Sequence, residues 1–159
     1  MMRSPLFAAL VLLALQACAQ TPAVAPLFAK AEWTVSAVSC PAGCSALTRD
    51  FLQTLPGKRV TLTQTRFDAP FVDACAGSVR YVPRQQAVAD VLNELRRAAP
   101  PDARAITQAS LGFASDAVLT TASVLCRDAS GEMSYQRLLS IEPGRVQVLF
   151  EEQSVIELR

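Results

Sequence analysis

The last third of the chain decides the fold, and its residues 117–158 read AVLTTASVLCRDASGEMSYQRLLSIEPGRVQVLFEEQSVIEL. Apolar and polar residues alternate there in short runs, which is typical of β-strands with one buried face. The runs predict strands over residues 117–126, 134–141, 145–150 and 154–158. The turn sequences Asp128–Gly131 and Glu142–Arg145 between them favour hairpins. The stretch therefore predicts an antiparallel meander.

Further strands precede this meander. They are expected over residues 33–38, 59–65 and 77–82, from the same reading of apolar and polar residues. In residues 59–65, Val60 and Leu62 should face inward. Residues 66–76, which contain Pro70, are expected to form a loop.

Two segments have the period of a helix instead. The first should follow Ser45, a residue type that caps helix N-termini, and dock one apolar stripe on the sheet. That stripe consists of Leu47, Phe51, Leu52 and Leu55. The second should begin at Arg84 and end before Pro100, with Val88, Val91, Leu92 and Leu95 on one face. The elements together predict an α+β domain, a curved antiparallel sheet or small β-barrel of about seven strands with two covering helices.

The N-terminus has the pattern of an export signal. Arg3 precedes the apolar run Leu6–Leu15, which is about half the length that a membrane-spanning helix needs. Leu15-Gln16-Ala17-Cys18 then resembles the lipobox of bacterial envelope lipoproteins. The resemblance covers only the leader. It implies a signal peptide over residues 1–17, a lipid on Cys18 that anchors the chain in the membrane, and a tether over residues 18–29.

Two mature forms remain open. In a host with two membranes, Ala19 after the lipidated cysteine implies sorting to the outer membrane, with the domain over residues 30–159 facing the periplasm. Ala17-Cys18-Ala19 also fits the rule for ordinary signal peptidase. A cut after Ala19 would give a periplasmic or secreted protein that begins at Gln20.

Composition excludes several functions. The chain has 51% hydrophobic and 18% charged residues and a formal net charge of +1, so it is globular and has no field to attract nucleic acid. It contains no histidine, which removes Ser-His and Cys-His nucleophiles and histidine metal sites. No cofactor and no metal site is expected.

The cysteines point to disulfides. Cys18 is either lipidated or discarded, which leaves Cys40, Cys44, Cys75 and Cys126 for the domain. An even number in an exported chain favours two disulfides, with three possible pairings. We expect Cys40 to pair with Cys44 and Cys75 with Cys126.

The segment Cys40-Pro-Ala-Gly-Cys44 has a second interpretation. It resembles the Cys-Pro-x-x-Cys loop of the Sco copper-chaperone and thiol family. That resemblance implies thiol redox or metal-handling chemistry at Cys40 and Cys44, because a helix N-terminus favours a thiolate. The histidine that completes the copper site of that family has no counterpart in this sequence.

The expected loop around Pro70 holds the candidate binding residues Phe67, Asp68, Phe71 and Asp73. Its two carboxylates could act as acid and base if burial separated their pKa values, or could cap turns and pair with arginine at the surface. Its two aromatic rings could fill the core or form the lip of a binding site.

These observations predict a non-enzymatic envelope lipoprotein whose domain binds another envelope protein or a small apolar ligand. A secreted inhibitor of a hydrolase such as lysozyme or a protease is the alternative, since rigid disulfide loops suit insertion into a cleft. A thiol redox or metal-handling protein is the third hypothesis, and it depends on Cys40 and Cys44 alone.

Overall fold

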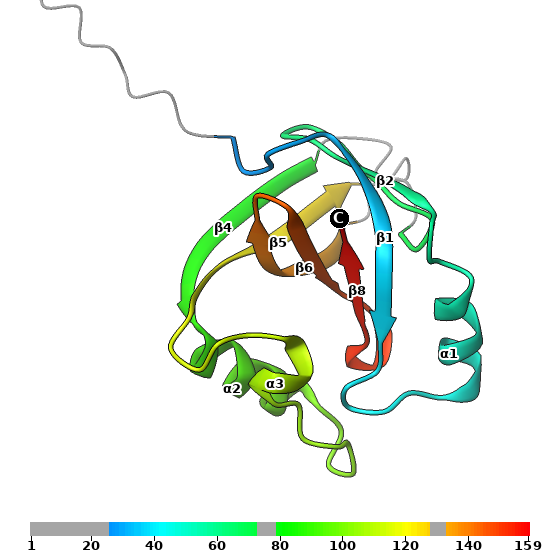
Figure 1. The fold of residues 1–159 in the computed structure, drawn as a ribbon, viewed down its shortest axis with the longest axis vertical. Coiled ribbons are helices and arrows are strands. Elements are labelled where there is room, and N and C mark those ends of the chain that lie inside the picture. The colour runs from blue at the N-terminus through cyan, green and yellow to red at the C-terminus, as the bar shows by residue number, and fades with distance from the viewer. Residues whose placement is uncertain (1–25, 73–78, 128–132) are drawn as a thin grey trace, which may run out of the picture.

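The computed structural model of the protein describes residues 26–72, 79–127 and 133–159. One antiparallel sheet curves into a nearly closed barrel, as Figure 1 shows. Its strands are β1 (Glu32–Ser39), β2 (Arg59–Leu62), β3 (Phe67–Asp68), β4 (Val79–Ala87), β5 (Val118–Arg127), β6 (Met133–Glu142), β7 (Arg145–Leu149) and β8 (Val155–Leu158). The order β3-β2-β1-β8-β7-β6-β5-β4 joins sequence neighbours and pairs β1 with β8, so the barrel is an up-and-down meander.

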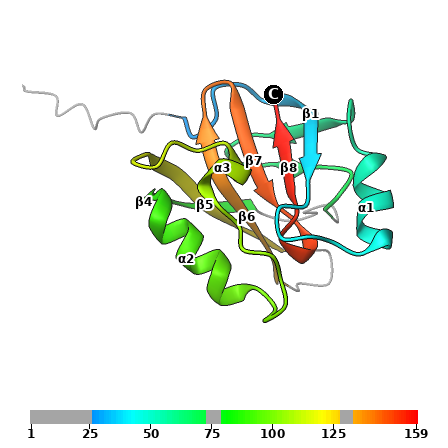
Figure 2. The ribbon, with the colours of Figure 1, turned by 60° about the horizontal axis from the view of Figure 1, so that its bottom comes forward.

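Helices lie outside the barrel. They are α1 (Ala46–Gln53), α2 (Val88–Ala98) and α3 (Gln108–Leu111), with a short 3₁₀ turn at Glu151–Gln153. Figures 1 and 2 place α1 at the opposite edge of the molecule from α2. The predicted fold class is therefore confirmed, although the described residues hold one strand and one α-helix more than expected.

The barrel interior is filled by apolar side chains. Trp33 and Phe67 are the largest, and each is 1% exposed. Val60 and Leu62 face inward as the alternation predicts, together with Val146 of β7. Burial of such side chains contributes about 1.5 to 3 kcal/mol each, which makes this cluster the main source of stability.

A second apolar layer covers the outside of the sheet. Val88, Val91 and Leu95 of α2 pack with Leu139 of β6 and Val155 of β8, and Figure 2 shows α2 and α3 on this side. The strands of this region are thus buried on both faces. For this reason Gln147, which the alternation assigns to a solvent face, is only 4% exposed.

Side chains close the barrel where the backbone does not. Among the described residues β3 pairs only with β2, and no strand pairs with the outer edge of β4. The hydroxyl of Tyr81 on β4 donates to the carbonyl of Arg66 at 2.9 Å, and the ring of Phe28 packs edge-on against Tyr81 at 5.0 Å. Burial raises the pKa of Tyr81, so the hydroxyl keeps its proton.

Several boundaries differ from the sequence expectation. The strand expected over residues 59–65 ends at Leu62, and the strand expected over residues 145–150 ends at Leu149. Residues 84–87 continue β4 instead of starting a helix, because their pairing with β5 extends to Ala87 and Val118. The short strand β3 interrupts the expected loop. Phe28 is 6% exposed, so packing begins inside the segment assigned to the tether.

The docking of α3 depends on one glycine. Gly112 ends α3 with a φ of 71°, a conformation that glycine adopts without strain. The carbonyl of Leu111 accepts hydrogen bonds from Arg145 Nη2 at 3.1 Å and Gln147 Nε2 at 3.0 Å. A Cβ atom at Gly112 would lie 3.1 Å from Arg145 Nη2.

We expect Gly112→Ala to lower the free energy of unfolding by about 1 to 2 kcal/mol, because alanine is strained at positive φ and crowds Arg145. Urea denaturation measures the loss. Gly144→Ala is the matched control, since its Cβ would meet no atom within 4 Å. Equal effects of the two substitutions would contradict this account.

Candidate functional site at the disulfide-anchored helix

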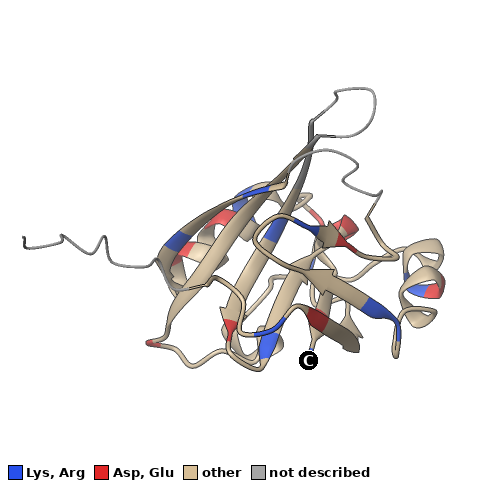
Figure 3. Ribbon diagram, turned by 90° about the horizontal axis from the view of Figure 1, so that it is seen from above, with Lys and Arg blue, Asp and Glu red and all other residues tan. Residues whose placement is uncertain are grey.

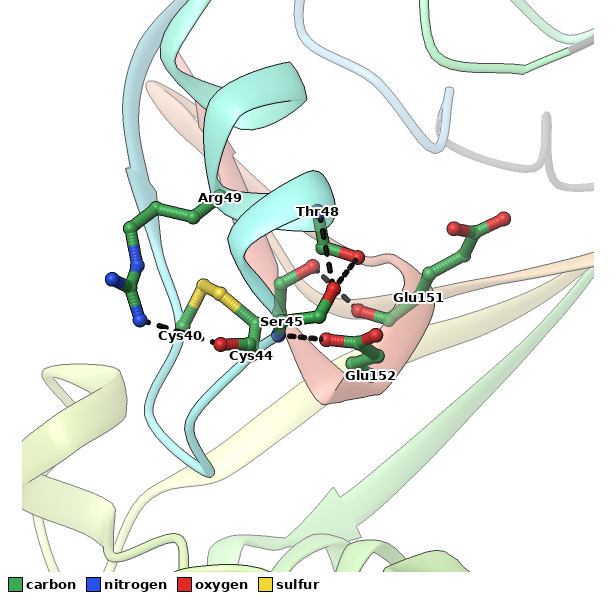
Figure 4. Close-up of a disulfide and its surroundings, with 8 residues drawn as sticks. Cys40, Cys44, Ser45, Thr48, Arg49, Glu151 and Glu152 are labelled. Carbon is green, nitrogen blue, oxygen red and sulfur yellow. Dashed lines mark hydrogen bonds between the residues drawn. A yellow bond between two sulfur atoms is a disulfide. The ribbon is translucent and has the colours of Figure 1, made fainter.

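A disulfide fixes the chain between β1 and α1. Cys40 and Cys44 are bonded, with their Cα atoms 5.7 Å apart, and Figure 4 shows the loop that they close. This pairing was predicted from the sequence and is confirmed. Cys126 is also disulfide-bonded, but its expected partner Cys75 lies outside the described residues, so that pairing stays a prediction.

The N-terminus of α1 is capped from two sides, as Figure 4 shows. Ser45 is the N-cap, and its Oγ accepts from the backbone N–H of Thr48 at 3.2 Å. The backbone N–H of Ser45 donates to Glu152 Oε2 at 2.6 Å. Arg49 Nη2 donates to the Cys44 carbonyl at 3.3 Å. Disulfide, cap and hydrogen bonds together hold the first turn of α1 in one position.

The residue that caps from outside the helix has an unusual backbone. Glu152 and Gln153 have φ values of 52° and 57°, in the left-handed region that residues other than glycine seldom adopt. The carboxylate of Glu152 thereby reaches Ser45, and the Gln153 amide donates to the carbonyl of Leu95 on α2 at 2.7 Å. The turn therefore joins α1 and α2 to the barrel.

An apolar surface extends from α1 beyond what packing requires. Thr48, Leu52 and Leu55 are buried, whereas Leu47 is 82% and Phe51 is 37% exposed. Successive helical residues differ in direction by about 100°, so Leu47 and Phe51 share a face beside the buried one. The expectation that all four apolar residues form one docked stripe is wrong for these two.

Aromatic rings connect this surface to the barrel interior. Phe51 stacks on Phe150 at 5.6 Å, Phe150 meets Phe71 at 6.1 Å, and Phe71 meets Phe67 at 6.5 Å. Leu47, Phe51 and Phe150 will be called the apolar patch. Because its rings continue into the core, the patch rests on a firmly packed base.

The candidates around Pro70 do not gather at one surface. Phe67 and Phe71 are 1% and 6% exposed, which corresponds to the core-filling alternative. Asp68 is exposed and pairs with Arg66. Asp73 lies outside the described residues, so a binding role for these four residues stays a prediction.

Sequence reasoning missed part of how this site is assembled. Phe150 lies in the predicted strand over residues 145–150, but β7 ends one residue earlier, and the Phe150 ring packs on the interior cluster and also stacks on Phe51. Glu152 carries no sequence signal for a left-handed turn, because neither glycine nor asparagine occupies the position.

Depressions for a small molecule are shallow or lack large apolar side chains. The apolar depression lined by Pro26, Phe28, Leu62 and Thr63 holds about 240 Å³, below the range of about 300 to 1,000 Å³ usual for ligand pockets. A second depression beside the disulfide loop holds about 370 Å³, but its lining consists of small, proline and polar residues such as Gly43, Ser45, Asp102 and Glu152. Among the described residues, no three cysteine, aspartate or glutamate side chains cluster as metal ligands would. No helix in the described segments is long and apolar enough to cross a membrane.

Comparisons with known proteins do not assign the chain to a family. No protein-family profile matches it, and no curated protein or solved structure resembles it significantly.

Removing the disulfide should weaken the fold without abolishing it. We expect the double variant Cys40→Ser, Cys44→Ser to lose about 2 kcal/mol of unfolding free energy, the chain-entropy value for so short a loop. Chemical denaturation followed by circular dichroism measures this loss. Ala46→Ser, an exposed change at the start of α1, is the control. A double variant as stable as the control would contradict the structural role of the bond.

The contact between Glu152 and Ser45 predicts a pH dependence. The N–H of Ser45 holds the pKa of Glu152 below its ordinary value. The stabilisation is therefore present above the unfolded-state pKa of about 4.3 and is lost as the pH falls through the lowered folded-state value.

The measurement is the stability difference between the wild type and Glu152→Gln at several pH values. We expect this difference to shrink from about pH 7 to about pH 2.5. Glu151→Gln is the control, because the Glu151 carboxylate makes no hydrogen bond to a described residue. A difference that stays constant with pH would show that the carboxylate is not the capping group.

Proposed function

We propose that the chain is an exported envelope lipoprotein, anchored through a lipid on Cys18, whose domain binds a protein partner and catalyses no reaction. The leader and the Leu15–Cys18 segment support export and lipidation. The absence of histidine from the sequence removes the commonest catalytic bases and nucleophile partners. The lipid would keep the domain at the membrane surface.

The observation that carries the proposal is the apolar patch. Exposed contiguous apolar side chains mark interaction sites, and aromatic residues often dominate binding energy. Leu47 is 82% exposed although the helix that bears it is held by a disulfide and two caps. A surface that is fixed before binding loses little conformational entropy when a partner docks.

The same surroundings favour a protein over an apolar ligand. The barrel interior is occupied by Trp33, Phe67 and their neighbours, so a ligand would have to displace the core. Leu47 and Phe51 of the patch lie on the outer side of a helix, and exposed helix residues suit insertion into a pocket of the partner.

Charge next to the patch favours a protein over a membrane surface. Asp50 precedes Phe51 on α1, Glu151 follows Phe150, and Glu152 caps the first turn of α1. Anionic lipid headgroups would be repelled by these carboxylates. Figure 3 shows both signs of charge on α1. A mixed polar rim around apolar anchors is the usual anatomy of a protein interface.

A secreted hydrolase inhibitor is the alternative. It would also bind a protein partner, but it would lack the lipid anchor. Its partner would be lysozyme or a protease, and the rigid Cys40–Cys44 loop beside the patch supports such a contact. Identification of the partner decides between the two. The thiol redox alternative requires that this disulfide be reduced and reoxidised.

Photo-crosslinking in the native envelope tests the proposal. A photoreactive amino acid at position 47 should give one discrete adduct, and Phe51→Asp in the same chain should reduce its yield at least about tenfold, because a carboxylate cannot enter an apolar pocket. The matched control places the photoreactive group at Gln53, which is exposed on another face of α1.

A circular dichroism melt shows whether Phe51→Asp is folded. If the adduct persists in the folded Phe51→Asp protein, or forms equally from position 53, the apolar patch is not the binding surface.

A further inference from the structure

The outer edge of β4 is an unpaired sheet edge within the described part of the chain. All nine residues of β4 pair with β5 on one side. On the other side the nearest strand is β3, which has two residues and pairs with β2. The described contacts at the gap involve the side chain of Tyr81, which donates a hydrogen bond to Arg66 and packs against the ring of Phe28. A long unpaired edge is a template for an added strand.

The register identifies which backbone groups face the gap. Val88 N–H donates to the carbonyl of Ala117 at 3.0 Å, which makes these two residues a hydrogen-bonded pair. Such pairs alternate along an antiparallel ladder, so every second residue of β4 turns its N–H and C=O away from β5. Before Ala87, which is the N-cap of α2, the outward residues are Val79, Tyr81, Pro83 and Gln85.

Pro83 lies at one of the outward positions, where a missing N–H breaks no hydrogen bond to β5. Pro83 lacks a backbone N–H, and prolines in sheets occupy edge strands with the missing donor facing outward. The hydrogen-bonding capacity left at the edge is the N–H of Val79, Tyr81 and Gln85 together with the carbonyls of all four outward residues. No described residue bonds to these groups.

Charge along the edge indicates the chemistry of a partner. Arg80 and Arg84 are exposed on the same face of β4, about 13 Å apart along the strand. Neither side chain has an ion-pair or hydrogen-bond partner among the described residues, whereas Arg66, Arg137 and Arg145 each pair with a carboxylate. Two unpaired cations on an open edge attract carboxylates.

A second copy of the chain fits this edge poorly. Pairing two β4 strands would continue one sheet and bring the arginine side chains of both copies together on its outer face. Like charges on neighbouring strands destabilise a sheet.

We propose that the open edge of β4 binds an extended acidic segment of a protein partner, which adds as a further strand and sets carboxylates against Arg80 and Arg84. Acidic residues four positions apart on the added strand match the spacing of the two arginines. This surface is separate from the apolar patch on α1, so either proposal can fail without the other.

The first test needs no partner. Hydrogen exchange followed by NMR should show the amides of Tyr81 and Gln85 exchanging at least about 100-fold faster than those of Val82 and Arg84, which pair with β5. Comparable protection of all four amides in the free protein would mean that the edge is already covered, and would overturn the proposal.

The second test uses a synthetic ten-residue peptide of alternating threonine and valine with two glutamates four positions apart. We expect it to bind, measured by fluorescence anisotropy, and to slow the exchange of Tyr81 and Gln85. A peptide N-methylated on the amides that would face β4 should lose binding, because it keeps the charge but cannot pair. Equal binding of the methylated peptide would overturn strand addition.

Charge reversal tests the second half of the proposal. The double variant Arg80→Glu, Arg84→Glu should bind the glutamate peptide about tenfold more weakly and gain binding to a lysine version of it. Arg59→Glu, at an exposed arginine of β2, should change neither affinity.

The contradicting outcomes are specific. Equal affinity of the wild type for the glutamate and lysine peptides would overturn the role of charge. Amide protection by the peptide that appears only outside β4 would show that the binding site is not the β4 edge. A lack of binding of either peptide to any variant would do the same. Dimerisation of the wild-type domain with protection of Tyr81 and Gln85 would show that a second copy occupies the edge.

Discussion

The structure depends on how a meander closes around one core when β3 is too short to reach β4. Backbone hydrogen bonds join the sheet from β3 through β1 and β8 to β4, and the remaining gap is bridged by the Tyr81 side chain, against which Phe28 packs. A side-chain bridge closes the barrel sterically but leaves part of an edge strand without backbone partners. The Tyr81 bridge thus both closes the barrel and leaves the edge of β4 exposed.

Apolar side chains fill the barrel interior, so the binding surfaces that we propose lie on the outside of the barrel. Trp33, Phe67 and the aliphatic residues around them leave the interior to the core, and α2 with α3 buries the outer face of the later strands. Within the described residues, the exposed side of α1 and the edge of β4 lie outside these packed layers. Both are rigid, the first through a disulfide and the second through complete pairing with β5.

The sequence predicted what local periodicity controls. The meander over residues 117–158 and the cap at Ser45 follow from alternation and side-chain chemistry, and the Cys40–Cys44 bond is the one expected among three possible pairings. It did not predict what tertiary contacts decide. Residues 84–87 have a helical pattern but stay in β4 because β5 pairs with them, and Gln147 is buried because α3 lies over it.

The candidate site was only partly predictable for the same reason. Helical periodicity places Leu47 and Leu55 in one apolar set, but a short helix on a curved sheet buries only part of that set. The left-handed turn at Glu152 and the open edge of β4 are properties of the closed barrel. The turn at Glu152 has no local sequence signal, and the proline that marks an edge strand, Pro83, falls one residue beyond the strand predicted over residues 77–82.

We propose that the domain is a binding module with a lipid anchor and with its cysteines in disulfides. The intact mass of the native protein tests this proposal most directly. Protein taken from the envelope of its own host is alkylated without reduction and weighed, which reports the N-terminus and the free thiols together. The account predicts a chain that begins at acylated Cys18 and carries no alkyl group. A chain that begins at Gln20, or one with alkylated cysteines, would contradict it.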